Sequence, residues 1–231
     1  MITKFSDFVE ALHNAGFSLA GGGDDGIYSI ISWGWNEAPP YETPIKWHTG
    51  CPETDPWVWR MRVLEECDDI AYGKLFFKKS GFITKEWYPY FLAVRRGSYG
   101  FDDAYESGVI SNAAKRVYDV VMREGILPSH IIKHMAGFSK EDKAVFERAL
   151  VELQMRMYIS ACGEQTKISK NGDEYAWPSS MFCTTESYFD SSVFEQAAAI
   201  TEEDATKKIT EQVLKLNPAA KASKIAKFIR G

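Results

Sequence analysis

The sequence has no long hydrophobic run. No segment reaches the roughly 18 consecutive apolar residues that a membrane-spanning helix needs, and the first residues, "MITKFSDFVEALHNAGF", alternate charged with apolar side chains. The continuous apolar stretch of a secretory signal peptide is therefore also missing. These two absences predict a cytoplasmic protein that does not bind a membrane.

Closely spaced cysteines, which mark many metal sites, are also missing. The four cysteines are Cys51, Cys67, Cys162 and Cys183. Reduced thiols are their simplest interpretation in a chain without a signal peptide. His130 and His134 are four residues apart, a spacing that two metal ligands could use, but no third ligand is evident nearby. We therefore expect neither a metal nor a cofactor.

The chain also has no excess of positive charge, since its formal net charge at pH 7 is −5. Such a charge gives no general electrostatic case for nucleic acid. Within the acidic N-terminal half, positive charge is concentrated in residues 74–96, where Glu86 is the single opposing acid. This basic island consists of Lys74, Lys78, Lys79, Lys85, Arg95 and Arg96. A solvated face and a phosphate-binding surface are both open interpretations of it.

What the sequence does contain is enough apolar material for a folded core, with 45% hydrophobic residues among 231. The patterns predict an α+β protein of winged-helix architecture in three parts. Residues 1–105 form an aromatic-rich mixed α/β unit, a degenerate winged-helix-like half. This unit packs on a winged-helix domain at 106–190, and a helical tail follows at 191–231.

The first part contains several expected elements. Apolar spacing predicts a helix over 3–15, and two strand-like runs cover 27–33 and 70–77. The sequence "KKSG" at 78–81 predicts a turn. Thr84 is expected to cap the helix that follows it.

The second part shows the order of a winged helix. Helices are predicted to begin at Ser111, Ser129 and Ser139, and two strand-like runs then flank Asn171-Gly172, a strong hairpin signal. In the tail, helices are predicted from Thr201 and after Pro218. Their apolar edges either dock on the rest of the chain or mediate self-association.

Residues 47–62, "WHTGCPETDPWVWRMR", contain the candidate site. Asp55 followed by Pro56 predicts a helix start, because the carboxylate accepts from free backbone N–H groups. In a functional interpretation Asp55 orients a water, His48 or Arg60 stabilises negative charge on a leaving base, and tryptophans stack that base. The stacking candidates are Trp47, Trp57 and Trp59. Alternatively, Asp55 is only a cap and the tryptophans seal a junction.

Three stretches carry a resemblance to a known family. They are "YGKLFFKKSGFITKEWYPYFLAVRR" (72–96), "AAKRVYDVVMREGILPSHIIKH" (113–134) and "ERALVELQMRMYISACGEQTKISKNGDEYAWP" (147–178). They resemble the winged-helix DNA glycosylases of the AlkZ/YcaQ type, which act in DNA repair. With "WHTG" at 47–50 and "DPWVWR" at 55–60, the whole chain is more similar to the smaller AlkZ-related proteins.

The resemblance implies a DNA-facing scaffold of tandem winged helices. The glycosylases also carry a catalytic Gln-x-Gln or Gln-x-Asp motif near the N-terminus, whereas the first glutamine of this chain is Gln154. Lys78, Lys79 and Ser80 stand where the larger enzymes have His-Glu-like residues. The resemblance therefore extends to the fold over residues 70–185 but not to the catalytic motif.

Two classes of function follow. The first is a DNA-associated protein that binds duplex DNA, either as a divergent glycosylase, with Asp55 and His48 as catalytic residues of an N-glycosylase-like hydrolase, or as a non-catalytic binder of DNA damage. The second is a winged-helix module for protein interaction or small-molecule sensing. The resemblance and the basic island beside aromatic residues support the first class, which we expect. The balanced charge of the expected recognition helix, 139–156, supports the second class as the alternative, since phosphate attraction dominates DNA affinity.

Overall fold

The computed structural model describes residues 1–97, 99–166 and 178–231, and the chain divides into two compact units. Unit 1 comprises residues 1–97 and 191–231, and unit 2 comprises residues 98–190. The segment predicted as a separate helical tail thus lies within unit 1. Both units are mixed α and β, with antiparallel strand pairing. No helix in the described part of the chain combines the length and the apolar character needed to cross a membrane.

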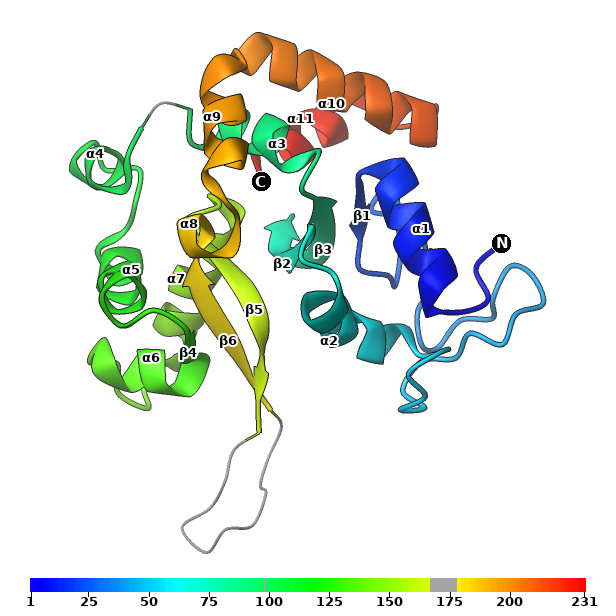
Figure 1. Cartoon of the computed structure of the whole chain (residues 1–231), viewed down its shortest axis with the longest axis horizontal. Helices are drawn as coiled ribbons and strands as arrows, with labels where there is room; N and C mark the ends of the chain where they lie inside the picture. Colours follow the sequence, from blue (N-terminus) through cyan, green and yellow to red (C-terminus); the bar gives the residue numbers. More distant parts are fainter. Residues whose placement is uncertain (98, 167–177) are drawn as a thin grey trace, which may run out of the picture. The chain divides into compact units, whose positions relative to one another are not determined.

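Unit 1 is an antiparallel sheet with helices from both ends of the chain. Its described elements are α1 (Phe5–Ala15), β1 (Phe17–Leu19), α2 (Pro56–Glu66), β2 (Ile70–Phe76), β3 (Lys79–Thr84), α3 (Tyr88–Arg95), α9 (Ser191–Ala199), α10 (Glu202–Leu216) and α11 (Ala222–Arg230). β3 pairs with both β1 and β2. The three C-terminal helices all contact α3 (Figure 1). The helices predicted at 3–15, after Thr201 and after Pro218 are confirmed.

The core of unit 1 is aromatic and is completed by the last helix. Phe228 of α11 is fully buried. Its ring centroid lies 4.1 Å from that of Phe76, 5.3 Å from that of Phe17 and 5.7 Å from that of Phe91. Aromatic side chains bury large apolar areas, and each such pair adds roughly 0.5–1.5 kcal/mol. Residues more than 200 positions apart are thereby held in one cluster.

The hairpin between β2 and β3 turns on two residues. Phe76 pairs with Lys79, which leaves Phe77 and Lys78 as the turn, with φ angles of 52° and 62°. Two-residue turns with both φ values positive usually contain Asn-Gly. The turn predicted at 78–81 is wrong because Gly81 lies within β3, where a Cβ atom would come within 2.5 Å of the Phe76 ring. That glycine permits packing rather than chain reversal.

Two further expectations for this half are wrong. The strand expected at 27–33 is reduced to a single bridge between Leu19 and Ser29, because side-chain hydroxyls take the place of the ladder. The Ser29 hydroxyl donates to the carbonyls of Leu19 and Ile31, at 3.2 and 2.8 Å. Thr84 ends β3 instead of capping a helix, and its hydroxyl donates to the Gly16 carbonyl.

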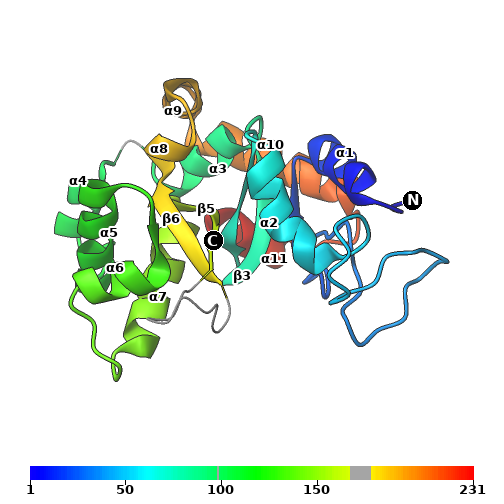
Figure 2. The same cartoon turned by 60° about the horizontal axis from the view of Figure 1, so that its bottom comes forward.

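Between β1 and α2 the chain forms a long irregular loop, drawn in blue in Figure 2. It contains no described element longer than a bridge. Apolar side chains nevertheless anchor it, since Ile27, Ile31, Trp33 and Ile45 are all buried. The loop is therefore a fixed part of unit 1, and its remaining aromatic side chains are presented on a supported backbone.

Unit 2 consists of helices followed by a hairpin. Its described elements are α4 (Phe101–Glu106), α5 (Asn112–Glu124), β4 (Leu127–Pro128), α6 (Ser129–Met135), α7 (Lys143–Met155), β5 (Ile159–Gln165), β6 (Ser179–Thr184) and α8 (Thr185–Tyr188). β6 pairs with both β4 and β5. The helix start predicted at Ser111 is confirmed, and Gly125 is the C-cap of the same helix.

The helix expected from Ser139 begins later, at Lys143. The Ser139 backbone and hydroxyl both donate to the carboxylate of Asp142, at 2.9 and 2.7 Å. Such local side-chain bonds offer the backbone an alternative to the first helical turn. The predicted Asn171-Gly172 turn lies outside the described residues.

Candidate functional site

Asp55 occupies the centre of the predicted site and is completely buried. As the N-cap of α2 it accepts the Trp57 N–H through Oδ1 at 2.8 Å, which confirms the predicted helix start. The same oxygen accepts the His48 N–H at 3.0 Å, and Oδ2 accepts the Gly50 N–H at 2.8 Å. Both oxygens are therefore engaged by backbone donors. The carboxylate fastens the loop 48–55 to the start of α2.

The loop that Asp55 fastens presents His48 among three tryptophans. His48 is exposed and has a φ angle of 59°. Its ring centroid lies 4.9 Å from that of Trp57, 6.3 Å from that of Trp47 and 6.4 Å from that of Trp35. We call these four residues the ring cluster. Trp35 is 73% exposed and Trp57 is 40% exposed, so the cluster opens to solvent.

Trp35 was not among the predicted site residues. The sequence gives little indication that Trp35 belongs to a site, because the glycine and prolines of "SWGWNEAPP" predict only an ordinary loop. Trp33, two positions earlier, is buried and its carbonyl accepts the Trp47 Nε1–H at 3.2 Å. One tryptophan of this pair thus anchors the loop while the other faces solvent.

Arg60 covers one face of Trp57. Its guanidinium carbon lies 3.4 Å from the centroid of that ring, and its Nε donates to the Trp57 carbonyl at 2.8 Å. A further contact of 3.4 Å joins Nη1 to the Tyr72 hydroxyl. The predicted grouping of His48, Trp57 and Arg60 therefore exists, with Arg60 stiffening the Trp57 ring.

Trp59 and Trp47 are placed differently from Trp57. Trp59 is fully buried, its Nε1 donates to the Pro52 carbonyl at 2.9 Å, and its ring lies 5.1 Å from that of Phe8. It is a core residue, which corrects its assignment as a stacking residue. Trp47 is half-buried and sits against Gly21, where a Cβ atom would come within 2.5 Å of the indole.

The basic island is dispersed in space. Lys78 and Lys85 flank the two ends of β3, and a strand of that length spans roughly 20 Å. Lys79 forms an ion pair of 2.8 Å with Asp25. Arg96 lies 6.0 Å from the centroid of the Phe194 ring. Lys74 is exposed on β2. Neighbours in the sequence therefore do not form one surface.

Arg95 is turned into unit 1, which corrects its assignment as a phosphate contact. Its guanidinium donates to the carbonyls of Leu75, Phe228 and Ile229, each at 2.8 Å. Burial lowers the pKa of Arg95 to about 9, an effect partly offset by Tyr88. The guanidinium still keeps its charge at neutral pH. Arg95 connects the end of α11 to β2.

A second group of cations lies on and beside α11 and was overlooked. These residues are Lys221, Lys224, Lys227 and Arg230, all exposed. None of them forms an ion pair with a described residue. This group could have been recognised in the sequence, since residues 218–231 contain no Asp or Glu beside these four cations. Only the apolar edge of this segment was predicted to be significant.

A family model described as AlkZ related matches residues 2–230. The chain belongs to the AlkZ-related family. The expected family resemblance is thereby confirmed, and it suggests a relation to DNA glycosylases. No curated protein and no solved structure matches the chain.

Metal-binding geometry is absent from the described part of this AlkZ-related chain, where no three His, Cys, Asp or Glu side chains gather in a way that could hold an ion. The His130 Nδ1 lies 3.0 Å from the Ser179 hydroxyl.

The cysteines form no disulfide, since all four are free. A hydrogen bond between the Cys162 and Cys183 thiols, with burial, raises the pKa of Cys183 above its usual range. Cys183 is thus a buried thiol and a poor nucleophile.

Proposed function

We propose that this AlkZ-related protein binds DNA at unpaired or damaged positions and does not remove bases. One observation carries the proposal. The ring cluster exposes Trp35, His48 and Trp57, while Asp55, the acid predicted to do the chemistry, is buried and bonded to three backbone N–H groups. The site offers exposed rings on which a nucleobase can stack, but it lacks a side chain that is free to act as a general base.

A glycosylase needs a carboxylate or amide that reaches a water beside the sugar carbon. Asp55 is 0% exposed, and its oxygens already hold the backbone at His48, Gly50 and Trp57. Freeing it would release the loop that presents His48. The Gln-x-Gln or Gln-x-Asp motif of the larger relatives is also missing. Both facts favour binding over turnover.

Stacking supports the choice of DNA as the partner. Aromatic rings bind any unpaired base through its face, and each stacked base contributes about 1–3 kcal/mol by alanine substitution. Trp35 and Trp57 are tryptophans with an exposed surface, and Arg60 holds the Trp57 ring in place. A nucleobase that is displaced from the DNA double helix at a damaged position could stack on such rings.

We further propose that unit 2 is a winged-helix module. The order α5, β4, α6, α7, β5 and β6 supports this, as does the pairing of β6 with both β4 and β5. Its α7 has no net charge, because Lys143 and Arg148 are balanced by Glu147 and Glu152. The main DNA contact is therefore assigned to unit 1.

The binding test compares duplexes that differ at one position. Wild-type protein is titrated against a paired duplex and against the same duplex with one bulged base or one abasic site. We expect tighter binding to the altered duplexes. Substitution of Trp35 and Trp57 by alanine should weaken that binding by about tenfold or more. Tyr99→Ala, which removes an exposed aromatic ring from unit 2, serves as the matched control. Equal affinity of the wild type for all duplexes would refute the proposal.

The absence of turnover is tested by base release from alkylated DNA. We expect no release by the wild type above the spontaneous rate. Release that disappears in Asp55→Asn, with the fold retained by circular dichroism, would instead establish the hydrolase.

A second candidate function has its own observation. Unit 2 exposes several large apolar side chains near the end of α5 and on α6, namely Met122, Ile126, Ile131 and Met135. Exposed apolar groups of this kind favour a protein contact. If unit 2 associates with a second copy, sedimentation should show a dimer that Ile126→Asp with Met135→Asp dissociates. A concentration-independent monomer rules this candidate out.

A further inference from the structure

The last helix, α11, is amphipathic, and its apolar side is fully used within unit 1. Ile225, Phe228 and Ile229 are buried, and Phe228 stacks on Phe76. Ile209 and Val213 of α10 are buried as well. The apolar edges on which self-association through the C-terminal helices would depend are therefore covered by their own unit. Only the polar side of α11 faces outward.

All charged residues on the outward side of α11 are basic. Lys224, Lys227 and Arg230 follow one another at intervals of three, which places them within an arc of about 120° at 100° per residue. Lys221 precedes them as the N-cap. By contrast, α10 mixes signs along its length, from Glu202 to Lys215. Charges of mixed sign, as on α10, are sufficient for solubility. Solubility therefore does not explain why the charged residues of α11 are all cations.

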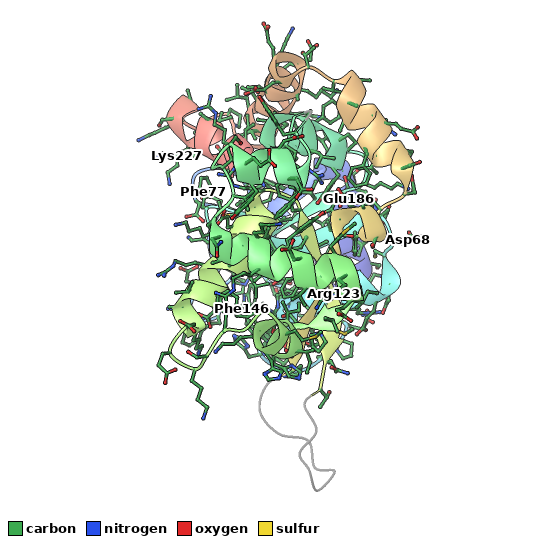
Figure 3. The ribbon with its side chains drawn as sticks, turned by 90° about the vertical axis from the view of Figure 1, so that its left-hand side faces the viewer. Asp68, Phe77, Arg123, Phe146, Glu186 and Lys227 are labelled. Carbon is green, nitrogen blue, oxygen red and sulfur yellow. The ribbon has the colours of Figure 1, made fainter. Side chains whose placement is uncertain are left out.

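The β2–β3 turn extends this surface. The Phe77 ring lies 6.1 Å from that of Phe228, and the Lys224 ammonium lies 5.4 Å from the Phe77 centroid. Phe77 and Lys227 are labelled at the same edge of the molecule in Figure 3. Lys78, the next turn residue, is exposed and makes no ion pair with a described residue. The α11 basic face is defined here as Lys78, Lys221, Lys224, Lys227 and Arg230.

Hydrogen bonds from Arg95 within unit 1 fix the position of the α11 basic face. Arg95 donates to the carbonyls of Phe228 and Ile229 at the end of α11 and to that of Leu75 in β2. These bonds satisfy carbonyls that a helix end leaves without partners. The ring contact between Phe77 and Phe228 holds the β2–β3 turn against the same helix. The cations thus stand on a rigid support.

The α11 basic face is better suited to binding a nucleic acid than to binding a membrane surface. A helix that binds at a membrane surface inserts its apolar side into the lipid. Here that side is occupied by the core, with Phe228 fully buried. A regular row of cations over the roughly 14 Å of a nine-residue helix suits the closely spaced phosphates of a nucleic acid backbone.

We propose that the α11 basic face contacts the phosphate backbone of DNA. This inference rests on the proposed function and assigns its electrostatic surface. The face supplies binding that is independent of sequence, while the ring cluster distinguishes unpaired from paired positions.

The test measures DNA affinity over a series of salt concentrations by fluorescence anisotropy. One variant replaces Lys221, Lys224, Lys227 and Arg230 with glutamine. A control variant replaces four exposed lysines elsewhere, at 140, 143, 207 and 215, and so changes the net charge equally. All eight residues are exposed, so both variants should fold, as circular dichroism would verify.

We expect the α11 variant to lose at least 100-fold in affinity at about 0.1 M salt, since each lost contact removes roughly tenfold there. The slope of log K against log salt should decrease by about 0.9 per contact. The control should keep its affinity within about threefold of wild type and its slope unchanged, as its lysines touch no phosphate.

The outcomes are distinguishable. If the wild type binds DNA and both variants weaken equally, or neither does, the α11 basic face is refuted while DNA binding stands. If the wild type binds neither duplex nor unpaired DNA, the proposed function itself fails. Binding instead to vesicles that contain phosphatidylserine, lost in the α11 variant, would assign the face to a membrane and overturn the inference.

Discussion

The basic island and the α11 basic face contain similar numbers of cations but differ in where those cations point. In the island, Arg95 bonds three carbonyls inside unit 1 and Lys79 pairs with Asp25, while Lys78 and Lys85 lie at opposite ends of β3. The α11 basic face shares Lys78 with the island, but its other four cations lie on or beside α11, where helical spacing brings them to one outward surface. Density of charge along a sequence is therefore a poorer guide to a binding surface than charge at the spacing of an element.

The same inward and outward division separates Trp59 from Trp57, two residues apart on α2. Trp59→Ala should lower the free energy of unfolding by about 3–5 kcal/mol, because it empties a fully buried site beside Phe8. Trp57→Ala should lower it by about 1 kcal/mol, since that ring is 40% exposed. Chemical denaturation of both variants checks this difference. Equal losses would break the distinction between a core ring and a ring available to a ligand.

Arg95→Met should be nearly as damaging. The substitution keeps the aliphatic stem but leaves the carbonyls of Leu75, Phe228 and Ile229 without donors, at about 3–5 kcal/mol of unfolding free energy. Lys227→Met on the outer side of α11 is the control and should change it by less than about 0.5 kcal/mol. Thermal and urea unfolding measure both. A stable Arg95→Met that has lost only DNA affinity would restore Arg95 as a phosphate contact.

Asp55→Ala should lower the free energy of unfolding by about 2–3 kcal/mol. It removes the cap of α2 and leaves the N–H groups of His48 and Gly50 without their acceptor. Glu53→Ala, which removes a surface acid paired with Arg62, should be nearly silent at about 0.5 kcal/mol. If Asp55→Ala is as stable as Glu53→Ala, the carboxylate is not retained for structure.

The smallest expected effect is at the turn. Lys78→Gly should raise the free energy of unfolding by about 1 kcal/mol, because glycine accepts positive φ without strain. It should also weaken DNA binding by about tenfold at 0.1 M salt if Lys78 contacts a phosphate. Lys78→Asn, neutral and tolerant of this φ, should weaken binding equally with less stabilisation. Gain of stability with unchanged affinity would remove Lys78 from the α11 basic face.

Local rules predicted much of the fold from sequence. Asp55, Ser111 and Thr201 each cap a helix as expected, because a cap depends on bonds within three residues. Errors arose where a distant residue decides the outcome. Gly81 lies in a strand because the Phe76 ring covers it, and residues around Ser29 leave the ladder because hydroxyls replace it.

The candidate site was predictable only in part for the same reason. The spacing of Trp57 and Arg60 on one helix made their contact foreseeable. Trp35 joins His48 across 13 positions of irregular loop, which no periodic pattern encodes. The burial of Arg95 depends on carbonyls more than 130 positions away, so its charge was expected at the surface.

The connectivity of unit 1 also determines the order in which the protein forms during synthesis. Phe17, Phe76 and Phe91 emerge from the ribosome long before Phe228, the ring that they enclose, and the whole of unit 2 is made in between. Since domains generally fold as units, unit 2 is able to fold while the N-terminal sheet still awaits its last helix. Nascent chains that stop before residue 228 should therefore display an unfilled aromatic pocket, the kind of surface that chaperones bind.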